Sequence, residues 1–294
     1  MHSNIAAGSG RTELVATGVP GIGLGNGEFD AVVAGLRNYL LKCAGPEPVP
    51  VAVPPVISRR LLERGGYVDA FPNLLGTIHS FTGDRHRWRE LTRVGRWHDD
   101  QEISDLAVLP ATCYHLYPLF ENEKLDTAVE LTAESYCYRH EARQEPGRLR
   151  SFRMREFVRI STPDDCLDWR DRWVTRAVGR LTSLGLAVSV EAADDPFFGD
   201  AARLMRASQL EQELKWELRV AVADRKDQAV ASLNYHKDHF GTAFTIRVDG
   251  AQAHTACAAF GLERITLALA HAHGPVLAQW PAEVRSALCL DNSL

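Results

Sequence analysis

Hydrophobic side chains recur along this chain with two different spacings. In residues 28–42 they return every three or four positions, which predicts an amphipathic helix with one buried face (Phe29, Val32, Leu36 and Leu40). In residues 148–160 they alternate with polar positions, which predicts a strand. The alternation places six side chains on one face of that strand: Arg148, Arg150, Phe152, Met154, Glu156 and Val158.

The remaining patterns define a fold class. They predict further helices at residues 58–64, 162–184 and 260–273, and further strands at residues 186–192, 215–223, 230–235, 244–248 and 254–259. Prolines favour an extended segment at residues 46–55. Because the strands do not alternate regularly with helices, the sequence predicts an α+β fold with an antiparallel sheet flanked by helices. We expect residues 1–20, which lack periodicity, to form a flexible arm and residues 21–294 to form a single domain.

Composition excludes several classes of protein. The 294 residues are 45% hydrophobic and 24% charged, which is typical of globular proteins, and the net charge of −5 disfavours a polyanion as the main partner. No apolar run reaches the roughly 18–20 residues that span a bilayer, and no secretory leader precedes the domain, so we expect a cytoplasmic protein without a membrane partner. The six cysteines form no CxxC pair, which excludes a zinc ribbon and disfavours a disulfide scaffold.

Basic residues are concentrated in one segment near residues 84–100. It carries five arginines and two histidines: Arg85, His86, Arg87, Arg89, Arg93, Arg96 and His98. One interpretation is a solvated helix face, and the other is an inserted docking surface for an acidic partner. If the partner is an acidic protein, charge reversal at Arg87 and Arg89 should weaken its docking.

Two arginine-bearing motifs indicate nucleotide chemistry. The first is Tyr136-Cys-Tyr-Arg139-His-Glu141, followed by a polar loop and by the strand with Arg148 and Phe152. The second is Gly261-Leu-Glu263-Arg264 at the head of a predicted helix. A guanidinium stays charged and offers a fixed fork of donors, which suits phosphate oxygens. In this order the motifs resemble motifs 2 and 3 of class II aminoacyl-tRNA synthetases. The alternative is a set of surface salt bridges on an unrelated fold.

The resemblance implies a role for each motif residue. Arg139 would hold the α-phosphate and the carboxylate of an amino acid, and Arg264 would bind the γ-phosphate, as the catalytic pair. Glu141 would contact the adenine edge, Arg148 the terminal phosphates and Phe152 the adenine ring, and Leu149 is a further ATP-binding position. Matching positions for further nucleotide contacts are Gln228, Ala229, Val230 and Ala231. Mg²⁺ is implied with ATP, although Gln228 replaces an acidic residue that is usual in synthetases.

A closer resemblance extends over most of the chain. It rests on six stretches: residues 54–58 (PPVIS), 76–81 (GTIHSF), 109–118 (LPATCYHLYP), 195–199 (DPFFG), 234–241 (NYHKDHFG) and 254–257 (HTAC). These look like the amino acid:[carrier protein] ligases, bacterial relatives of the atypical seryl-tRNA synthetase of methanogenic archaea. The resemblance implies that ATP activates glycine or alanine as an adenylate, which is transferred to the phosphopantetheine thiol of an acidic carrier protein.

The same resemblance implies one zinc ion per subunit, held by Cys113, Glu156 and Cys257, with Glu156 also contacting the amino acid. Two thiolates and one carboxylate leave a tetrahedral zinc one position short, which a substrate amine would fill. A buried carboxylate on the strand face of Phe152 needs such a cation. Without the resemblance, Cys113 and Cys257 would be core thiols, and Glu156 would pair with Arg153 or Arg155.

Three further expectations concern partners. Class II cores usually dimerise through motif 1, which here would be residues 49–57 and the helix after them, so we expect a homodimer. Few residues follow motif 3, so we expect no tRNA-binding domain and no tRNA partner. The alternatives left open are a truncated aminoacyl-tRNA synthetase and a non-catalytic synthetase paralogue, which usually loses motif arginines.

Overall fold

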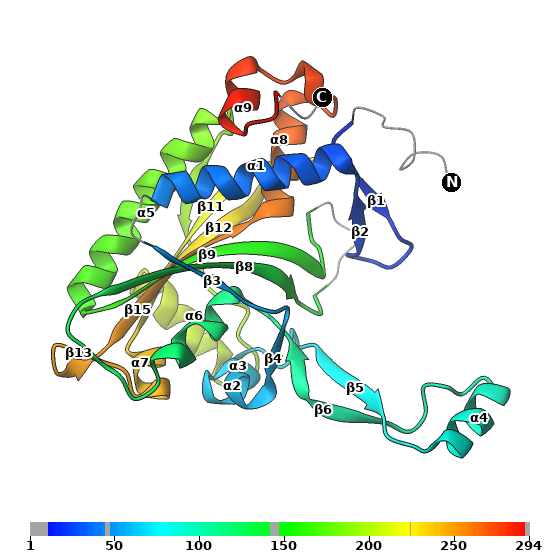
Figure 1. Cartoon of the computed structure of the whole chain (residues 1–294). Helices are drawn as coiled ribbons and strands as arrows, with labels where there is room; N and C mark the ends of the chain where they lie inside the picture. Colours follow the sequence, from blue (N-terminus) through cyan, green and yellow to red (C-terminus); the bar gives the residue numbers. More distant parts are fainter. Residues whose placement is uncertain (1–10, 45–47, 142–146, 224, 292–294) are drawn as a thin grey trace.

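A seven-stranded sheet forms the centre of the molecule (Figure 1). The computed structural model describes residues 11–44, 48–141, 147–223 and 225–291. Its main sheet has the strand order β10 (Ser189–Ala192), β11 (Lys215–Val222), β12 (Arg225–Lys237), β15 (His254–Gly261), β9 (Ser151–Ser161), β8 (Val129–Tyr138) and β3 (Val49–Ala52). All neighbouring pairs are antiparallel except β3 and β8. The prediction of an antiparallel sheet is confirmed.

Smaller elements surround this sheet. The other strands are β1 (Leu14–Ala16), β2 (Gly23–Gly25), β4 (Val56–Ser58), β5 (Thr77–Phe81), β6 (Gln101–Val108), β7 (Lys124–Leu125), β13 (Arg247–Val248) and β14 (Ala251–Gln252). The α-helices are α1 (Gly27–Ala44), α2 (Arg59–Arg64), α3 (Tyr67–Ala70), α4 (Arg85–Arg93), α5 (Pro163–Ser183), α6 (Ala202–Glu211), α7 (His239–Phe244), α8 (Leu262–His273) and α9 (Ala282–Ala287). Three short 3-10 helices are η1 (Thr112–His115), η2 (Tyr117–Phe120) and η3 (Leu277–Gln279).

One face of the sheet is an apolar layer covered by α1, α5 and α8. Phe157 of β9 stacks on Trp173 of α5 at 4.5 Å between ring centroids, and both are buried. Burying one such ring contributes roughly 2–3 kcal/mol. Helix α5 covers most of the predicted range 162–184 and begins with Thr162 at the N-cap and Pro163 in the first turn. The odd-numbered face of β9 is therefore used for packing.

The opposite face of the sheet carries shorter helices and is less filled. Two buried clusters lie there, one around η1, η2 and α7 and one around α2 and α3. Phe152, Met154, Glu156 and Val158 of β9 point to this side. The alternation predicted for this strand thus separates a packed face from a face that can hold a site.

Several predicted elements differ from the structure. Residues 11–20 are not a flexible arm, because β1 pairs with β2 and Arg11 bridges to Val276; residues 1–10 lie outside the described part. Of the strand expected at 244–248 only β13 forms, because α7 occupies residues up to Phe244 with Gly241 against the carbonyl of Ala253. Helix α6 was not predicted. The strand expected from 148 begins at Ser151, because the Arg150 amide donates to Gly21.

The basic segment lies at the end of a projecting arm. Strands β5 and β6 pair and extend from the body, with α4 at their far end (Figure 1). Helix α4 is exposed apart from Leu91, as expected of a solvated helix. Arg87 forms ion pairs with Asp100 and Glu90, and Arg96 pairs with Asp99. The arginines of α4 without such a pair among the described residues follow a four-residue spacing along one stripe: Arg85, Arg89 and Arg93.

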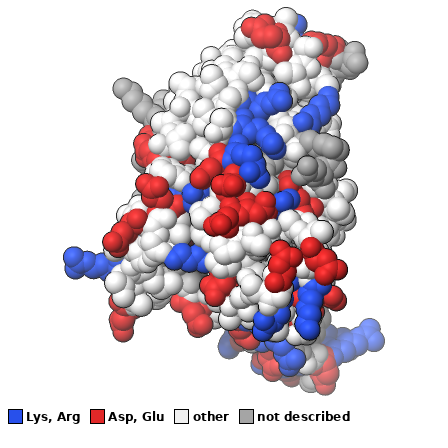
Figure 2. Space-filling model, turned by 90° about the vertical axis from the view of Figure 1, so that its left-hand side faces the viewer, with Lys and Arg blue, Asp and Glu red and all other residues white. Residues whose placement is uncertain are grey.

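Charge elsewhere on the surface is mixed. Figure 2 shows the side on which α5 lies, where one group of basic side chains in the upper part borders acidic side chains below it. Positive charge on this face is therefore local rather than extended. Within the described ranges, each helix is too short or too polar to cross a bilayer.

Candidate active site

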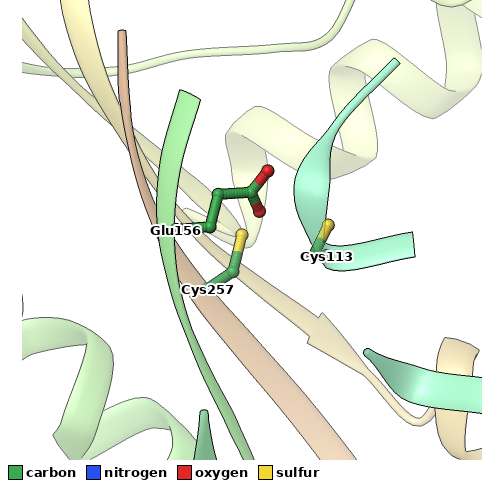
Figure 3. A group of neighbouring side chains, drawn as sticks. All are labelled: Cys113, Glu156 and Cys257. Atoms are coloured by element: carbon green, nitrogen blue, oxygen red, sulfur yellow. The ribbon is translucent and has the colours of Figure 1, made fainter. Parts of the chain in front are cut away.

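Three buried side chains of types that can bind a metal ion converge on the less-filled side of the sheet. Glu156 projects from β9 and Cys257 from the neighbouring β15, and both point toward Cys113 on η1 (Figure 3). Their ligand atoms all lie within 4.8 Å of one another. Cys113 is 5%, Glu156 1% and Cys257 3% exposed, so water cannot neutralise charge on the group. The structure thus assembles the three residues for which the sequence implied a metal.

Hydrogen bonds hold this trio in place from behind. The Thr112 amide donates to Glu156 Oε1 at 2.6 Å, which fixes one carboxylate oxygen. Asn234 Nδ2 donates to Cys257 Sγ at 3.3 Å, and His236 Nε2 lies 3.6 Å from the same sulfur. The alternative pairing of Glu156 with Arg153 or Arg155 is wrong, because Arg153 bonds to Glu263 at 2.7 Å and Arg155 to Glu134 at 2.9 Å.

The three groups also perturb one another's protonation. Burial, and then the Cys257 sulfur, raises the pKa of Glu156 to about 7. The Cys113 thiol lowers the pKa of Cys257 well below its usual value, and burial opposes this effect. Cys257 in turn raises the pKa of Cys113. Three groups that would each be anionic share one buried site, and this donor set suits a divalent cation such as zinc.

A second pocket next to the trio contains most of the predicted nucleotide contacts. Seven of these residues line it: Arg139, Leu149, Phe152, Ala229, Val230, Ala231 and Arg264. The Arg139 guanidinium lies over the Phe152 ring, 5.6 Å from its centroid. The half-buried Arg264 guanidinium donates hydrogen bonds to the carbonyl oxygens of Gly147, at 2.9 Å, and Ala229. We refer to this space as the nucleotide pocket.

Positive charge accumulates in the nucleotide pocket. Burial, and then the charges of Arg139 and Arg148, lowers the pKa of Arg264 to about 10. An arginine that shares its pocket with Arg139 favours an anion with several oxygens, such as a triphosphate. The alternative of surface salt bridges is therefore wrong for Arg264. Glu263 is not a ligand group either, because it is buried against the Arg153 amide and guanidinium.

Three predicted nucleotide contacts lie elsewhere in the described structure. Glu141 and Arg148 form an ion pair with each other and do not line the pocket. Arg148 precedes β9, so the strand alternation does not determine its direction. Gln228 is buried, with its Oε1 against Gly147, whose positive φ of 80° and close packing exclude a larger residue. Residues 142–146, which form most of the polar loop predicted between Glu141 and Arg148, lie outside the described residues.

A larger cavity of about 800 Å³ joins the metal-binding trio to the nucleotide pocket. Five residues line both spaces: Arg139, Met154, Lys215, Ser232 and Ala259. We call it the trio cavity, because Cys113, Glu156 and Cys257 lie in its wall. A ligand in this cavity can therefore contact both the trio and Arg139.

Sequence reasoning missed several charged residues at this junction. Lys215 Nζ lies 2.7 Å from Asp195 Oδ1 and 3.1 Å from Glu217 Oε1, and all three line one or both spaces. Burial opposes the charge on Asp195, but Lys215 and Gln209 offset it and lower its pKa. Asp195 lies within the matched DPFFG stretch, which was the available signal. Lys215 began a predicted strand and carried no motif.

Fold and site together define a class II aminoacyl-tRNA synthetase core, and comparison with known proteins supports this class. Residues 96–273 match the family described as "tRNA synthetase class II core domain (G, H, P, S and T)". Amino acid–[acyl-carrier-protein] ligase 1 of Bradyrhizobium diazoefficiens is 41% identical over 247 residues, covering 81% of this chain and 75% of that protein. Ligase 2 of the same organism is 38% identical over 282 residues, covering 93% and 84%. The chain belongs to the amino acid–[acyl-carrier-protein] ligase family within the class II synthetases.

More distant relatives agree with this fold. A type-2 serine–tRNA ligase of Methanocaldococcus jannaschii is 30% identical over 166 residues, which is 53% of this chain and 32% of that protein. The structure of M. kandleri SerRS in complex with A. aeolicus tRNASec superposes with a TM-score of 0.80 at 21% identity. It covers 94% of this chain and 58% of the synthetase. At this identity the likeness establishes the fold alone.

Proposed function

We propose that this protein uses ATP to activate a small amino acid, glycine or alanine, as an aminoacyl-adenylate and transfers the aminoacyl group to the phosphopantetheine thiol of a carrier protein. The observation that carries the proposal is the continuity of the two spaces. Cys113, Glu156 and Cys257 lie in the wall of a cavity that shares Arg139 with the nucleotide pocket. An amino acid between them would have its carboxylate next to the α-phosphate.

The trio would bind one zinc ion per chain. Two thiolates and one carboxylate are suitable zinc ligands, and when bound the ion would offer its fourth position to the α-amino group of the substrate. The Thr112 amide keeps Glu156 turned toward the sulfurs, and Asn234 and His236 orient Cys257. Selection for an amine is thus built into a rigid part of the sheet.

The arginines would carry the first chemical step. A carboxylate oxygen of the amino acid attacks the α-phosphorus, the bond to the β-phosphate breaks, and pyrophosphate leaves. Arg139 would hold the α-phosphate and the carboxylate, Arg264 the γ-phosphate, and Phe152 the adenine ring. Mg²⁺ would accompany ATP. Position 228 is a glutamine, and the carboxylate that lines the nucleotide pocket is that of Glu217. Catalysis by positioning and charge needs no protein nucleophile.

The second step would transfer the aminoacyl group. The sulfur of the carrier thiol attacks the acyl carbon, AMP leaves with the bonding electron pair, and the thiol proton passes to solvent. The trio cavity is larger than glycine or alanine requires, which leaves room for the thiol to approach.

A homodimer is part of the proposal, since β3 of the predicted motif 1 forms an edge of the main sheet with Val49 57% exposed.

The test of the proposed function is pyrophosphate exchange with each of the twenty amino acids, repeated as a transfer assay with a holo-carrier protein and with tRNA. We expect ATP–pyrophosphate exchange that depends on glycine or alanine, and a thioester on the holo-carrier that the apo-carrier does not form. Charging of tRNA without charging of the carrier would reverse the assignment to a synthetase. Absence of exchange with every amino acid would favour a non-catalytic paralogue.

Charge reversal on α4 tests where the carrier docks. Replacing Arg85, Arg89 and Arg93 together by glutamate is expected to raise the KM for an acidic carrier about tenfold, because opposite charges steer association. Amino-acid-dependent exchange should not change, since α4 lies at the end of the arm. The matched control is Arg172→Glu, which reverses an exposed charge on α5 of the body and should leave the KM for the carrier normal. A normal KM in the triple variant would locate the docking surface elsewhere.

A further inference from the structure

Tyr67 is a buried tyrosine whose hydroxyl has no hydrogen-bond partner among the described residues. It is 5% exposed and lines the trio cavity. Its ring packs against Phe71 at 5.3 Å and against the edge of Tyr114 at 5.5 Å. Buried hydroxyls in proteins are nearly always bonded, so an isolated one in a cavity wall indicates a ligand contact.

A glycine pair directs Tyr67 into this cavity. Gly65 and Gly66 connect α2 to α3, and Gly66 has a φ of 73°, which side chains rarely adopt. A Cβ at Gly66 would lie 3.1 Å from the His239 ring, whose Nε2 is 2.9 Å from the Gly65 carbonyl oxygen. The backbone is therefore fixed on both sides of the turn, and the Tyr67 ring has little freedom to reach another partner.

The hydroxyl is a donor at neutral pH. Burial raises the pKa of Tyr67 to about 12, and the nearby positive charge of Arg139 opposes this effect. A protonated hydroxyl in an apolar wall can donate one hydrogen bond to an acceptor inside the cavity. The described residues offer no acceptor within hydrogen-bond distance of this hydroxyl, so a ligand in the cavity can supply one.

Arg139 is the second donor that faces this space. Among the described residues, the Arg139 side chain donates one long hydrogen bond, 3.4 Å from Nε to the Pro110 carbonyl oxygen. A guanidinium has five N–H donors, so Arg139 retains donors for a ligand. A hydroxyl and a guanidinium in one cavity match an anion with two oxygens separated by one carbon, which is a carboxylate.

We propose that the Tyr67 hydroxyl donates a hydrogen bond to the α-carboxylate of the substrate beside Arg139. The inference rests on the proposed function, since it takes the substrate to be an amino acid. It adds a specificity determinant: the trio selects the amine, and Tyr67 with Arg139 rejects amines that lack a carboxylate. A site built to bond a polar group discriminates strongly against analogues without it.

The test uses Tyr67→Phe, which removes only the hydroxyl. The KM for the amino acid in pyrophosphate exchange is expected to rise about tenfold, with the KM for ATP and kcat little changed. Ethylamine, as a competitive inhibitor without a carboxylate, should keep its inhibition constant. The matched control is Tyr235→Phe, which lies in the same cavity wall but whose hydroxyl pairs with His254, and its amino-acid KM should remain normal.

Thermal unfolding of the ligand-free protein separates binding from a structural role. Tyr67→Phe should melt at the same temperature as the parent protein or higher, because an unbonded buried hydroxyl is lost. A lower melting temperature with an unchanged amino-acid KM, or an equal loss of amino acid and ethylamine, would overturn the proposal. If the parent protein shows no amino-acid-dependent exchange, the proposed function fails instead.

Discussion

Replacing Arg139 by alanine is expected to lower amino-acid-dependent pyrophosphate exchange by about 100- to 1,000-fold. This residue lines both the nucleotide pocket and the trio cavity, so in the proposed reaction the variant would lose contacts to both reacting groups. Its charge would also stabilise the negative charge that develops during attack on the α-phosphorus. The measurement is the initial rate of exchange at saturating ATP and amino acid.

Two variants control for this result. Arg139→Lys keeps the charge without the planar fork and should recover only part of the rate. Arg180→Ala removes an arginine from α5 on the packed side of the sheet, where it lies over the Tyr39 ring, and should exchange normally. Normal exchange in Arg139→Ala would refute the assignment of the nucleotide pocket.

The second large effect is expected from the metal-binding trio. Cys257→Ala should weaken zinc binding by more than the roughly 10- to 100-fold that is typical when a residue behind a ligand is changed. Removing the thiolate leaves Cys113 and Glu156 as a two-residue site, and exchange should fall with the metal content. Zinc per chain, measured by elemental analysis after dialysis, checks the expectation independently of activity.

A neighbouring thiol provides the control for the metal. Cys137 is as buried as Cys257, and its sulfur lies 3.7 Å from the Thr112 hydroxyl rather than in the trio. Cys137→Ala should therefore keep both the zinc and the exchange activity. A parent protein that is fully active after chelation and contains no metal would end the zinc proposal.

The sequence predicted the fold where local patterns agree with tertiary packing. Residues 28–42 and 162–184 form α1 and α5, because their apolar spacing and the Thr162-Pro163 start need no long-range information. The strand at 244–248 is mostly wrong because α7 takes residues that also fit an extended pattern. The sequence alone does not show that Gly241 packs against the Ala253 carbonyl, which favours this short helix.

The residues of the candidate site also fall into those that the sequence predicted and those that only tertiary packing reveals. Motif resemblance predicted the trio and the arginines, because these residues keep a recognisable order along the chain. Alternation placed Phe152 and Glu156 on one face, but it did not extend to Arg148, which precedes β9. Tyr67 and Lys215 were not predicted, because only the packing of α3 and β11 brings them to the cavity and their own neighbours along the chain carry no motif.

The pairing register of strand β9 with β15 positions both the candidate site and the apolar layer. Opposite β15, Glu156 faces Ala259 and Phe157 faces Ala258, so adjacent residues serve the chemistry and the aromatic layer in turn. A slip of one position would send the carboxylate among Trp173 and Phe260 and turn a phenyl ring toward the two thiols. A shifted register would therefore destabilise the fold on both faces of the sheet. A chain whose hydrophobic layer has formed correctly has, by the same alignment, already assembled its ligands.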